Sequence, residues 1–399
     1  MYLAINVIGI FVFLALGILL SKRRKDINWQ GVTALLALNL AIAWFLTSFS
    51  VGRDMVNWAA AGFVWLVSVA YDGIAFAFPD WVYVKQMNFF TSALLPILFV
   101  VPLFDILTYF GILPFVIRWI GRALAMISHQ PKFESFFAIE MMFLGTTEAL
   151  AVSGLQLKRM KADRCLTLAM MSMSCITAAM VGIYTSMMPA RFILTAIPLN
   201  IINALLVTNI LHPVKISEEE DTVAQITDGG REREPFFSFL GNSILGAGRL
   251  ILIICANVIA FVALAAFFNK IMMLIHPSFT LENTLGVIMF PFAWLMGLDT
   301  AEAFKLAEYM GTKLITNEFV VMLHAREVID SFSPHMQCVL TTFITSFANF
   351  GTLGMIIGAM KGLVDDSKNE LISRNVLYMM ISGILVSLLS AGMAGLFIW

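Results

Sequence analysis

The sequence has few charged residues for its length. Of its 399 residues, 13% are Asp, Glu, Lys or Arg and 60% are hydrophobic. A soluble globular domain has about 25% charged residues, so this chain lacks much of the charge that keeps a protein surface hydrated. The composition therefore excludes an ordinary soluble protein and predicts a polytopic protein of the cell membrane, surrounded by the lipid bilayer.

Excess positive charge and grouped cysteines are also lacking. The formal net charge is −1, whereas a nucleic-acid interface needs Lys and Arg clustered on one face, so we expect no nucleic-acid partner. The four cysteines stand singly in apolar stretches, without Cys-x-x-Cys or His-paired spacing. Neither a disulfide framework nor a metal cluster is indicated, and we expect no organic cofactor.

Long uncharged runs are what the sequence has instead. A hydrocarbon core about 30 Å thick needs about 20 helical residues to cross it, and eight runs without Asp, Glu, Lys or Arg reach about that length. They are 2–20, 27–52, 86–104, 165–190, 192–211, 250–269, 334–360 and 375–399. We predict an all-α membrane protein with eight transmembrane helices.

Basic residues indicate the orientation of these helices. Lys and Arg are enriched on the cytoplasmic side of a membrane, and Lys22, Arg23, Arg24 and Lys25 directly follow the first run. We therefore expect the N-terminus outside the cell and the polar segment 215–235 inside. Three further apolar stretches are predicted to be interfacial helices; they are 55–71, 111–127 and 284–298.

Two more segments carry carboxylates within apolar sequence. Residues 133–155 and 301–323 share the pattern Glu-x-Phe-x-x-x-Glu followed by a further glutamate, Glu148 or Glu318. With the topology above, the first segment enters from the cytoplasm and the second from outside, which is the arrangement of an inverted repeat. We predict that each segment forms a re-entrant hairpin of two half-helices.

The hairpin tips indicate a ligand. A carboxylate at mid-bilayer costs at least about 2.5–3.5 kcal/mol, so Glu148 and Glu318 point to a binding or proton-relay role. Alternatively, each pairs with backbone amides or with Lys313 only to hold its tip. The tips offer hydroxyl, amide and carboxylate groups, including Asn317, but no Arg or Lys for an anion. We expect a neutral ligand rich in hydrogen-bond donors, such as a sugar-like diol, a nucleobase or a nucleoside.

The seventh predicted span adds polar groups at helical spacing. Ser346, Asn349 and Thr352 are spaced at i, i+3 and i+6, which places them on one helix face. Phe347 adds an aromatic plane beside them. Small polar residues in membrane helices often serve packing alone, but an intramembrane amide such as that of Asn349 favours a ligand contact.

Three stretches give the chain a family resemblance. With GTTEA (145–149), TNEFV (316–320) and SFANFGTLG (346–354), it resembles a concentrative nucleoside transporter of the bacterial eight-helix type over nearly its whole length. The resemblance implies a homotrimeric symporter that imports purine or pyrimidine nucleosides by an elevator mechanism. It implies that Thr146, Thr147 and Glu148 face the nucleobase, that Glu318, Asn349 and Thr352 bind the ribose hydroxyls, and that Phe347 packs against the nucleoside.

The same resemblance implies four parts of the chain. Residues 1–110 would hold scaffold helices and an interfacial helix, and 214–283 a cytoplasmic loop and the sixth, scaffold, span. Residues 111–213 would form the first repeat of the transport domain, with an interfacial helix, the first hairpin and spans four and five. Residues 284–399 would form the second repeat, with an outer interfacial helix, the second hairpin and spans seven and eight.

The chain departs from this family in two places. Thr146 stands where the family commonly has Gln, so the choice between purine and pyrimidine stays open. Sodium-coupled members have an Asn where this chain has Met141, and a Ser near the position of Ala179. A thioether is a poor ligand for a hard cation, so a sodium site near Met141, Leu144 and Ala179 would be degenerate. We expect H+ as the coupling ion, with Na+ as the alternative.

Other functions remain as alternatives at this point. A transporter for another neutral polar solute could use the same inverted repeat. An intramembrane enzyme is disfavoured because the sequence shows neither a metal-spaced set nor a nucleophile–base pair, and the lone His335 is interpreted as structural. A channel would lack barriers at the bilayer midplane and would show currents instead of saturable uptake.

Overall fold

The computed structural model describes residues 1–399 except 86, 146–148, 151, 218–219, 222–233 and 278. Within the described residues all regular secondary structure is helical. Seven helical stretches are long and apolar enough to cross a membrane, which confirms the prediction of an all-α polytopic membrane protein. They are α1 (Tyr2–Leu20), α2 (Trp29–Thr47), α3 (Ser50–Ala77), Phe90–Tyr109, which ends in α5 (Ile97–Tyr109), α12 (Ala190–Leu211), α13 (Phe236–Met273) and α20 (Val376–Gly395).

Two of the predicted spans are each built from two shorter helices. Residues 165–190 contain most of α10 (Ala162–Ser172) and all of α11 (Ala178–Thr185), while 334–360 contain α17 (Pro334–Ile344) and nearly all of α18 (Phe350–Lys361). The intervening residues include Ser, Thr and Asn, whose side chains compete for backbone hydrogen bonds and so favour helix ends. The uncharged runs were therefore found correctly, but their interruptions were not.

Both interruptions pack against α20 at Gly383. A Cβ atom at Gly383 would lie 2.8 Å from the Cβ of Ala348 and 3.1 Å from that of Met173. Ala348 lies in the interruption between α17 and α18, and Met173 begins the one between α10 and α11. Only a residue without a side chain allows the backbone to approach this closely.

The three stretches predicted to be interfacial all form helices, with corrected bounds. Residues 111–127 correspond to α6 (Ile112–Ser128), and 284–298 overlap α14 (Leu281–Trp294). Residues 55–71 lie within α3, which has 28 residues and by length and composition could also cross a membrane. An interfacial position of these helices stays a prediction.

The two carboxylate segments both contain a break between helices. The second forms α15 (Thr300–Ile315) and α16 (Glu318–Ala325), with non-helical Thr316 and Asn317 between them. The first begins with α7 (Lys132–Leu144), which ends at Gly145 with φ +94°, a value that favours glycine. Its tip, with Thr146, Thr147 and Glu148, lies outside the described residues. α9 (Gly154–Arg159) follows.

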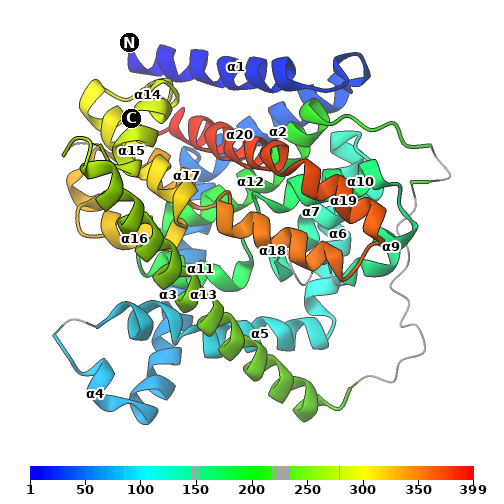
Figure 1. The fold of residues 1–399 in the computed structure, drawn as a ribbon. Coiled ribbons are helices and arrows are strands. Elements are labelled where there is room, and N and C mark those ends of the chain that lie inside the picture. Colours follow the sequence, from blue (N-terminus) through cyan, green and yellow to red (C-terminus); the bar gives the residue numbers. More distant parts are fainter. Residues whose placement is uncertain (86, 146–148, 151, 218–219, 222–233, 278) are drawn as a thin grey trace.

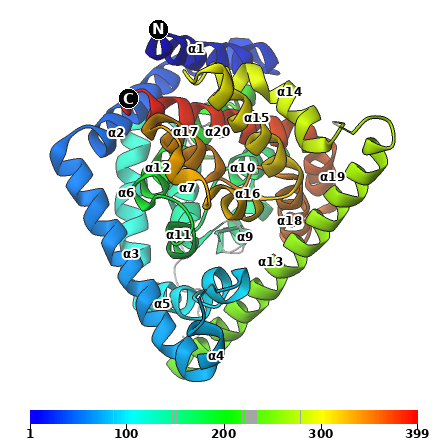
Figure 2. The same ribbon diagram turned by 90° about the vertical axis from the view of Figure 1, so that its left-hand side faces the viewer.

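The helices are arranged around a buried centre. α12 and α20 are mostly buried, and α1 and α2 pack against them. α3 and α13 are mostly exposed and form two long arms that meet near α4 (Pro79–Val82) and α5, as Figure 2 shows. α19 (Asp366–Arg374) joins α18 to α20, and α1 lies along one side of the molecule beside α20 (Figure 1).

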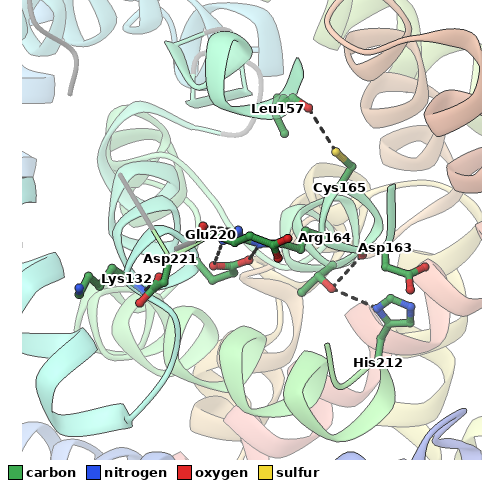
Figure 3. A network of polar contacts seen from close by, with 10 residues as sticks. Lys132, Leu157, Asp163, Arg164, Cys165, His212, Glu220 and Asp221 are labelled. Carbon is green, nitrogen blue, oxygen red and sulfur yellow. Dashed lines mark hydrogen bonds and ion pairs between the residues drawn. The ribbon is translucent and has the colours of Figure 1, made fainter. Parts of the chain in front are cut away.

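A polar network connects α7, α10 and the segment after α12 (Figure 3). The Arg164 guanidinium donates from Nε and Nη2 to the two carboxylate oxygens of Glu134, at 2.8 and 2.9 Å, and from Nη1 to the Glu220 carbonyl at 2.9 Å. Asp221 accepts from the backbone N–H of Lys132 at 2.7 Å, where the helix dipole of α7 favours a negative charge. Glu134, one of the repeated carboxylates, is thus a structural partner of Arg164.

Breaking this buried ion pair should destabilise the protein. The side chains of Arg164 and Glu134 are 3% and 6% exposed, and removing one partner leaves an uncompensated buried charge that costs about 3–5 kcal/mol. We expect Glu134→Gln to lower the thermal unfolding midpoint of the detergent-purified protein clearly. Glu370→Gln is the control, because the Arg374–Glu370 side chains are 76% and 62% exposed and such pairs contribute about 1 kcal/mol or less. Equal shifts in the two variants would contradict the assignment.

Candidate binding site

Two helix N-termini meet at one buried carboxylate. α16 begins at Glu318, and the side-chain oxygen of Asn317 accepts from the Val320 N–H at 3.1 Å. α18 begins after Asn349, whose side-chain oxygen accepts from the Thr352 N–H at 2.9 Å. Asn is among the most favourable N-cap residues, so TNEF and ANFG each start a helix at this place. The positive ends of two helix dipoles therefore point toward the same region.

Glu318 connects three elements through its carboxylate. Its Oε1 accepts from the Tyr184 hydroxyl of α11 at 3.0 Å, and its Oε2 accepts from the Asn349 side-chain amide at 3.1 Å. The residue is only 3% exposed. An ionised carboxylate has about four lone-pair sites, so these two bonds leave acceptor capacity for a ligand.

A cavity of about 590 Å³ lies beside this carboxylate. Its volume is in the range of about 300–1,000 Å³ that is usual for small-molecule sites. Most of its lining is apolar. The candidate residues that line it are Asn317, Glu318, Phe347, Asn349 and Thr352. The structure thus brings together the described residues that the sequence selected for the substrate site, from the second carboxylate segment and the seventh predicted span.

Part of the cavity lining comes from α5 and α13. Asp105, Asn242, Ser243 and Arg249 line it there, and the Ser243 hydroxyl donates to the Asp105 carboxylate. Sequence reasoning did not select these residues. For Asp105 and Arg249, the sequence did offer a signal, since each is a charged residue at the end of a long uncharged run.

Tyr184 was also missed. It is fully buried, and its ring lies 5.3 Å from that of Phe319 at an interplanar angle of 71°, which is an edge-to-face contact. The only signal was one tyrosine within the uncharged run 165–190. Its hydrogen-bond partner, Glu318, is 134 positions away in the sequence, a separation that no local pattern can predict.

The remaining repeated carboxylates and the predicted ion position lie in other surroundings. Glu140 accepts from the Ser153 hydroxyl at 2.9 Å, so it pairs within the first carboxylate segment. The Ser172 hydroxyl donates to the Leu168 carbonyl at 2.9 Å and lies 3.4 Å from the sulfur of the fully buried Met141. A soft, buried sulfur contacting a hydroxyl does not suit a hard cation.

Interrupted helices that meet at a buried carboxylate beside a cavity are the arrangement of a membrane transporter. Comparison with known proteins agrees with this class. The model of the Na+ dependent nucleoside transporter C-terminus matches residues 192–395, and that of the N-terminus matches residues 8–81. The chain belongs to this nucleoside transporter family and is not an enzyme.

Curated relatives and solved structures share the whole length of the chain. It is 45% identical to the purine nucleoside transport protein NupG of Bacillus subtilis over 100% of both chains. It is 25% identical to the nucleoside permease NupC of Helicobacter pylori, over 98% of this chain and 97% of that protein.

CNTnw in an inward-facing substrate-bound state matches with a TM-score of 0.92 at 24% identity, over 100% of this chain and 98% of that chain. A CNTnw variant in an outward-facing state matches with a TM-score of 0.93 at 23% identity, over 100% and 99%. At this identity the likeness shows the fold alone.

Removing the Tyr184 hydroxyl should weaken the site without disturbing the fold. In Tyr184→Phe one oxygen of the buried Glu318 loses its partner, and a hydrogen bond to a charged group contributes about 1.5–3 kcal/mol. We expect the transport efficiency, Vmax/KM for nucleoside uptake, to fall about tenfold or more. Tyr309→Phe is the control, since Tyr309 is a buried tyrosine of α15 that does not line the cavity. Wild-type efficiency in Tyr184→Phe would exclude this contact as functional.

Proposed function

We propose that the protein is a secondary active symporter that imports nucleosides into the cell by an elevator-type alternating-access mechanism coupled to protons. The observation that carries this proposal is the buried Glu318, which lies at two capped helix N-termini and faces the cavity in a member of the nucleoside transporter family. In an apolar cavity, such a carboxylate would select a ligand by the hydroxyl groups that the ligand carries.

The ribose would bind at the two N-termini. A vicinal diol presents two O–H donors, and the Glu318 carboxylate supplies acceptors that its bonds to Tyr184 and Asn349 leave free. The Thr352 hydroxyl already donates to the side-chain oxygen of Asn349 at 3.2 Å. The two side chains are thus fixed relative to each other and can position the second hydroxyl of the ribose diol. Asn317 would contact the substrate at the same edge, and Phe347 would pack against it.

The nucleobase would face the first hairpin. We assign Thr146, Thr147 and Glu148 to it on the basis of the family resemblance, although they lie outside the described residues. Purine nucleosides are favoured as substrates, because the relative that is 45% identical over the full length is named a purine nucleoside transport protein.

Proton coupling is supported by the surroundings of Met141. Its sulfur contacts the Ser172 hydroxyl, whereas a sodium ion would need oxygen ligands. Glu148 or Glu318 would then be the group that takes up the proton. A potential of about 100 mV is worth about 2.3 kcal/mol per charge moved, so one proton could hold an inward gradient of about 50-fold.

Sodium coupling is the second candidate. The family model that matches residues 192–395 describes Na+ dependent transporters, and backbone carbonyls could supply the oxygens that Met141 does not.

Our proposal for the function also includes a homotrimer in the cell membrane with the N-terminus outside. It also includes the four-part division of the chain at residues 110, 213 and 283, with both repeats moving against the scaffold helices.

Variants of the ribose contacts test the substrate assignment. Glu318→Gln and Asn349→Ala each remove hydrogen bonds to the diol, so we expect initial rates of adenosine uptake to fall by about 100-fold or more. Membrane insertion and oligomeric size should stay unchanged. Glu308→Gln is the matched control, because Glu308 belongs to the same hairpin but pairs with Lys305. Wild-type rates in either site variant would refute the ribose assignment.

Imposed gradients test the coupling ion. We expect proteoliposomes to accumulate radiolabelled adenosine above equilibrium under an inward proton gradient and not under an inward sodium gradient, because Met141 replaces an oxygen ligand. Uridine uptake under the same conditions reports the preference for purines. Accumulation driven by sodium alone would overturn proton coupling, and equal uptake of the two nucleosides would overturn the purine preference.

A further inference from the structure

Lys313 is a fully buried lysine whose function the site described so far does not include. It lies in α15, three positions before Thr316, and its relative exposure is 0%. Placing an ammonium group away from water costs free energy unless hydrogen bonds and opposite charge compensate it. A buried lysine at this position therefore needs hydrogen-bond or charged partners that offset this cost.

The ammonium group holds the end of α17. Its Nζ donates to the Phe343 carbonyl at 2.7 Å and lies 4.6 Å from the centre of the Phe343 ring. The last carbonyls of a helix have no partner within the helix, and a cation is favourable beside them. Lys313, from the second hairpin, thus stabilises the place where the seventh span is interrupted.

A directed chain of hydrogen bonds leads from Lys313 to α20. Nζ also donates to the Ser346 hydroxyl at 2.6 Å, so this oxygen acts as an acceptor. Ser346 lies 2.7 Å from Ser387, and Ser387 donates its own proton to the Gly383 carbonyl at 2.9 Å. Each hydroxyl has one proton, so Ser346 must donate to Ser387. The ammonium group thereby fixes the orientation of the whole chain.

The two interrupted segments hold each other at two points. Lys313, before the break in the hairpin, contacts the start of the interruption 345–349 at Phe343 and Ser346. Glu318, after that break, contacts its end at Asn349.

We propose that Lys313 is a positioning residue of the substrate site, which fixes the interruption between α17 and α18 so that Glu318 and Asn349 present their polar atoms to the substrate. It does not line the cavity, so it acts through these residues and touches no substrate. The inference rests on the proposed function, because the substrate group that Glu318 and Asn349 select is the ribose diol. Its consequence is that Lys313 controls discrimination between a ribonucleoside and an analogue without the diol.

The test compares Lys313→Met with the wild type. Methionine has a similar length but neither charge nor donors. We measure KM and Vmax for adenosine and 2′,3′-dideoxyadenosine in proteoliposomes, corrected for the amount of folded protein. The wild type should prefer adenosine, and Lys313→Met should lower this preference about tenfold or more. Lys305→Met is the matched control, since Lys305 is a partly exposed lysine of the same helix that pairs with Glu308, and its preference should equal that of the wild type.

Two further variants separate positioning from stability. Ser346→Ala removes an acceptor of the ammonium group with little change in volume and should lower the preference about threefold or more; it also serves as the test if Lys313→Met does not fold. In a double-mutant cycle, the effects of Lys313→Met and Asn349→Ala on Vmax/KM for adenosine should be clearly non-additive, as expected of residues that act as a unit.

The outcomes distinguish two failures. If the wild type prefers adenosine and neither Lys313→Met nor Ser346→Ala changes that preference, Lys313 has only a structural role and this inference is wrong. If the wild type transports both compounds equally well, the ribose assignment fails, and the role of Lys313 fails with it.

Discussion

The need to pair the backbone N–H and C=O groups at helix ends is the constraint on which this structure depends. A membrane interior offers no water to the polar groups that an interrupted helix exposes, so the protein must supply partners for them. It does so with side chains of the interrupted segments, either from the residue that precedes the helix or from another segment. Asn317 and Asn349 occupy the N-termini, and Lys313 occupies a C-terminus. The groups that complete the helices are therefore neighbours of those that face the cavity.

This arrangement explains why one carboxylate can stay buried among apolar helices. Glu318 is surrounded by a hydroxyl, an amide and two helix N-termini, and each favours negative charge. The polar atoms form a fixed frame before any ligand arrives. Pre-organised contacts of this kind reduce the ordering cost of binding, so an apolar cavity needs few polar groups to be selective.

Local patterns in the sequence predicted the parts of the site that depend on local physics. The carboxylate segments and the uncharged runs follow from composition and spacing within about 20 residues. The prediction that Ser346, Asn349 and Thr352 share one helix face was wrong, because Ser346 and Asn349 lie in the interruption between α17 and α18 and Asn349 starts α18. The breaks near Met173 and Thr345, the contact of Tyr184 with Glu318 and the position of Lys313 depend on tertiary packing. Lys313 was considered only as a partner that would neutralise Glu318, whereas its hydrogen bonds go to Phe343 and Ser346. Its burial could not be read from one helix.

The contact at Gly383 joins the two interrupted spans in a way that restricts how their sequences can change. Ala348 and Met173 belong to the two interrupted spans, yet both reach the same point of α20. Any change of volume at one of these three positions must be absorbed by the other two. Sequence change in the two interrupted spans is therefore coupled through a single position that lacks a side chain, and relatives are expected to show compensating side-chain sizes there.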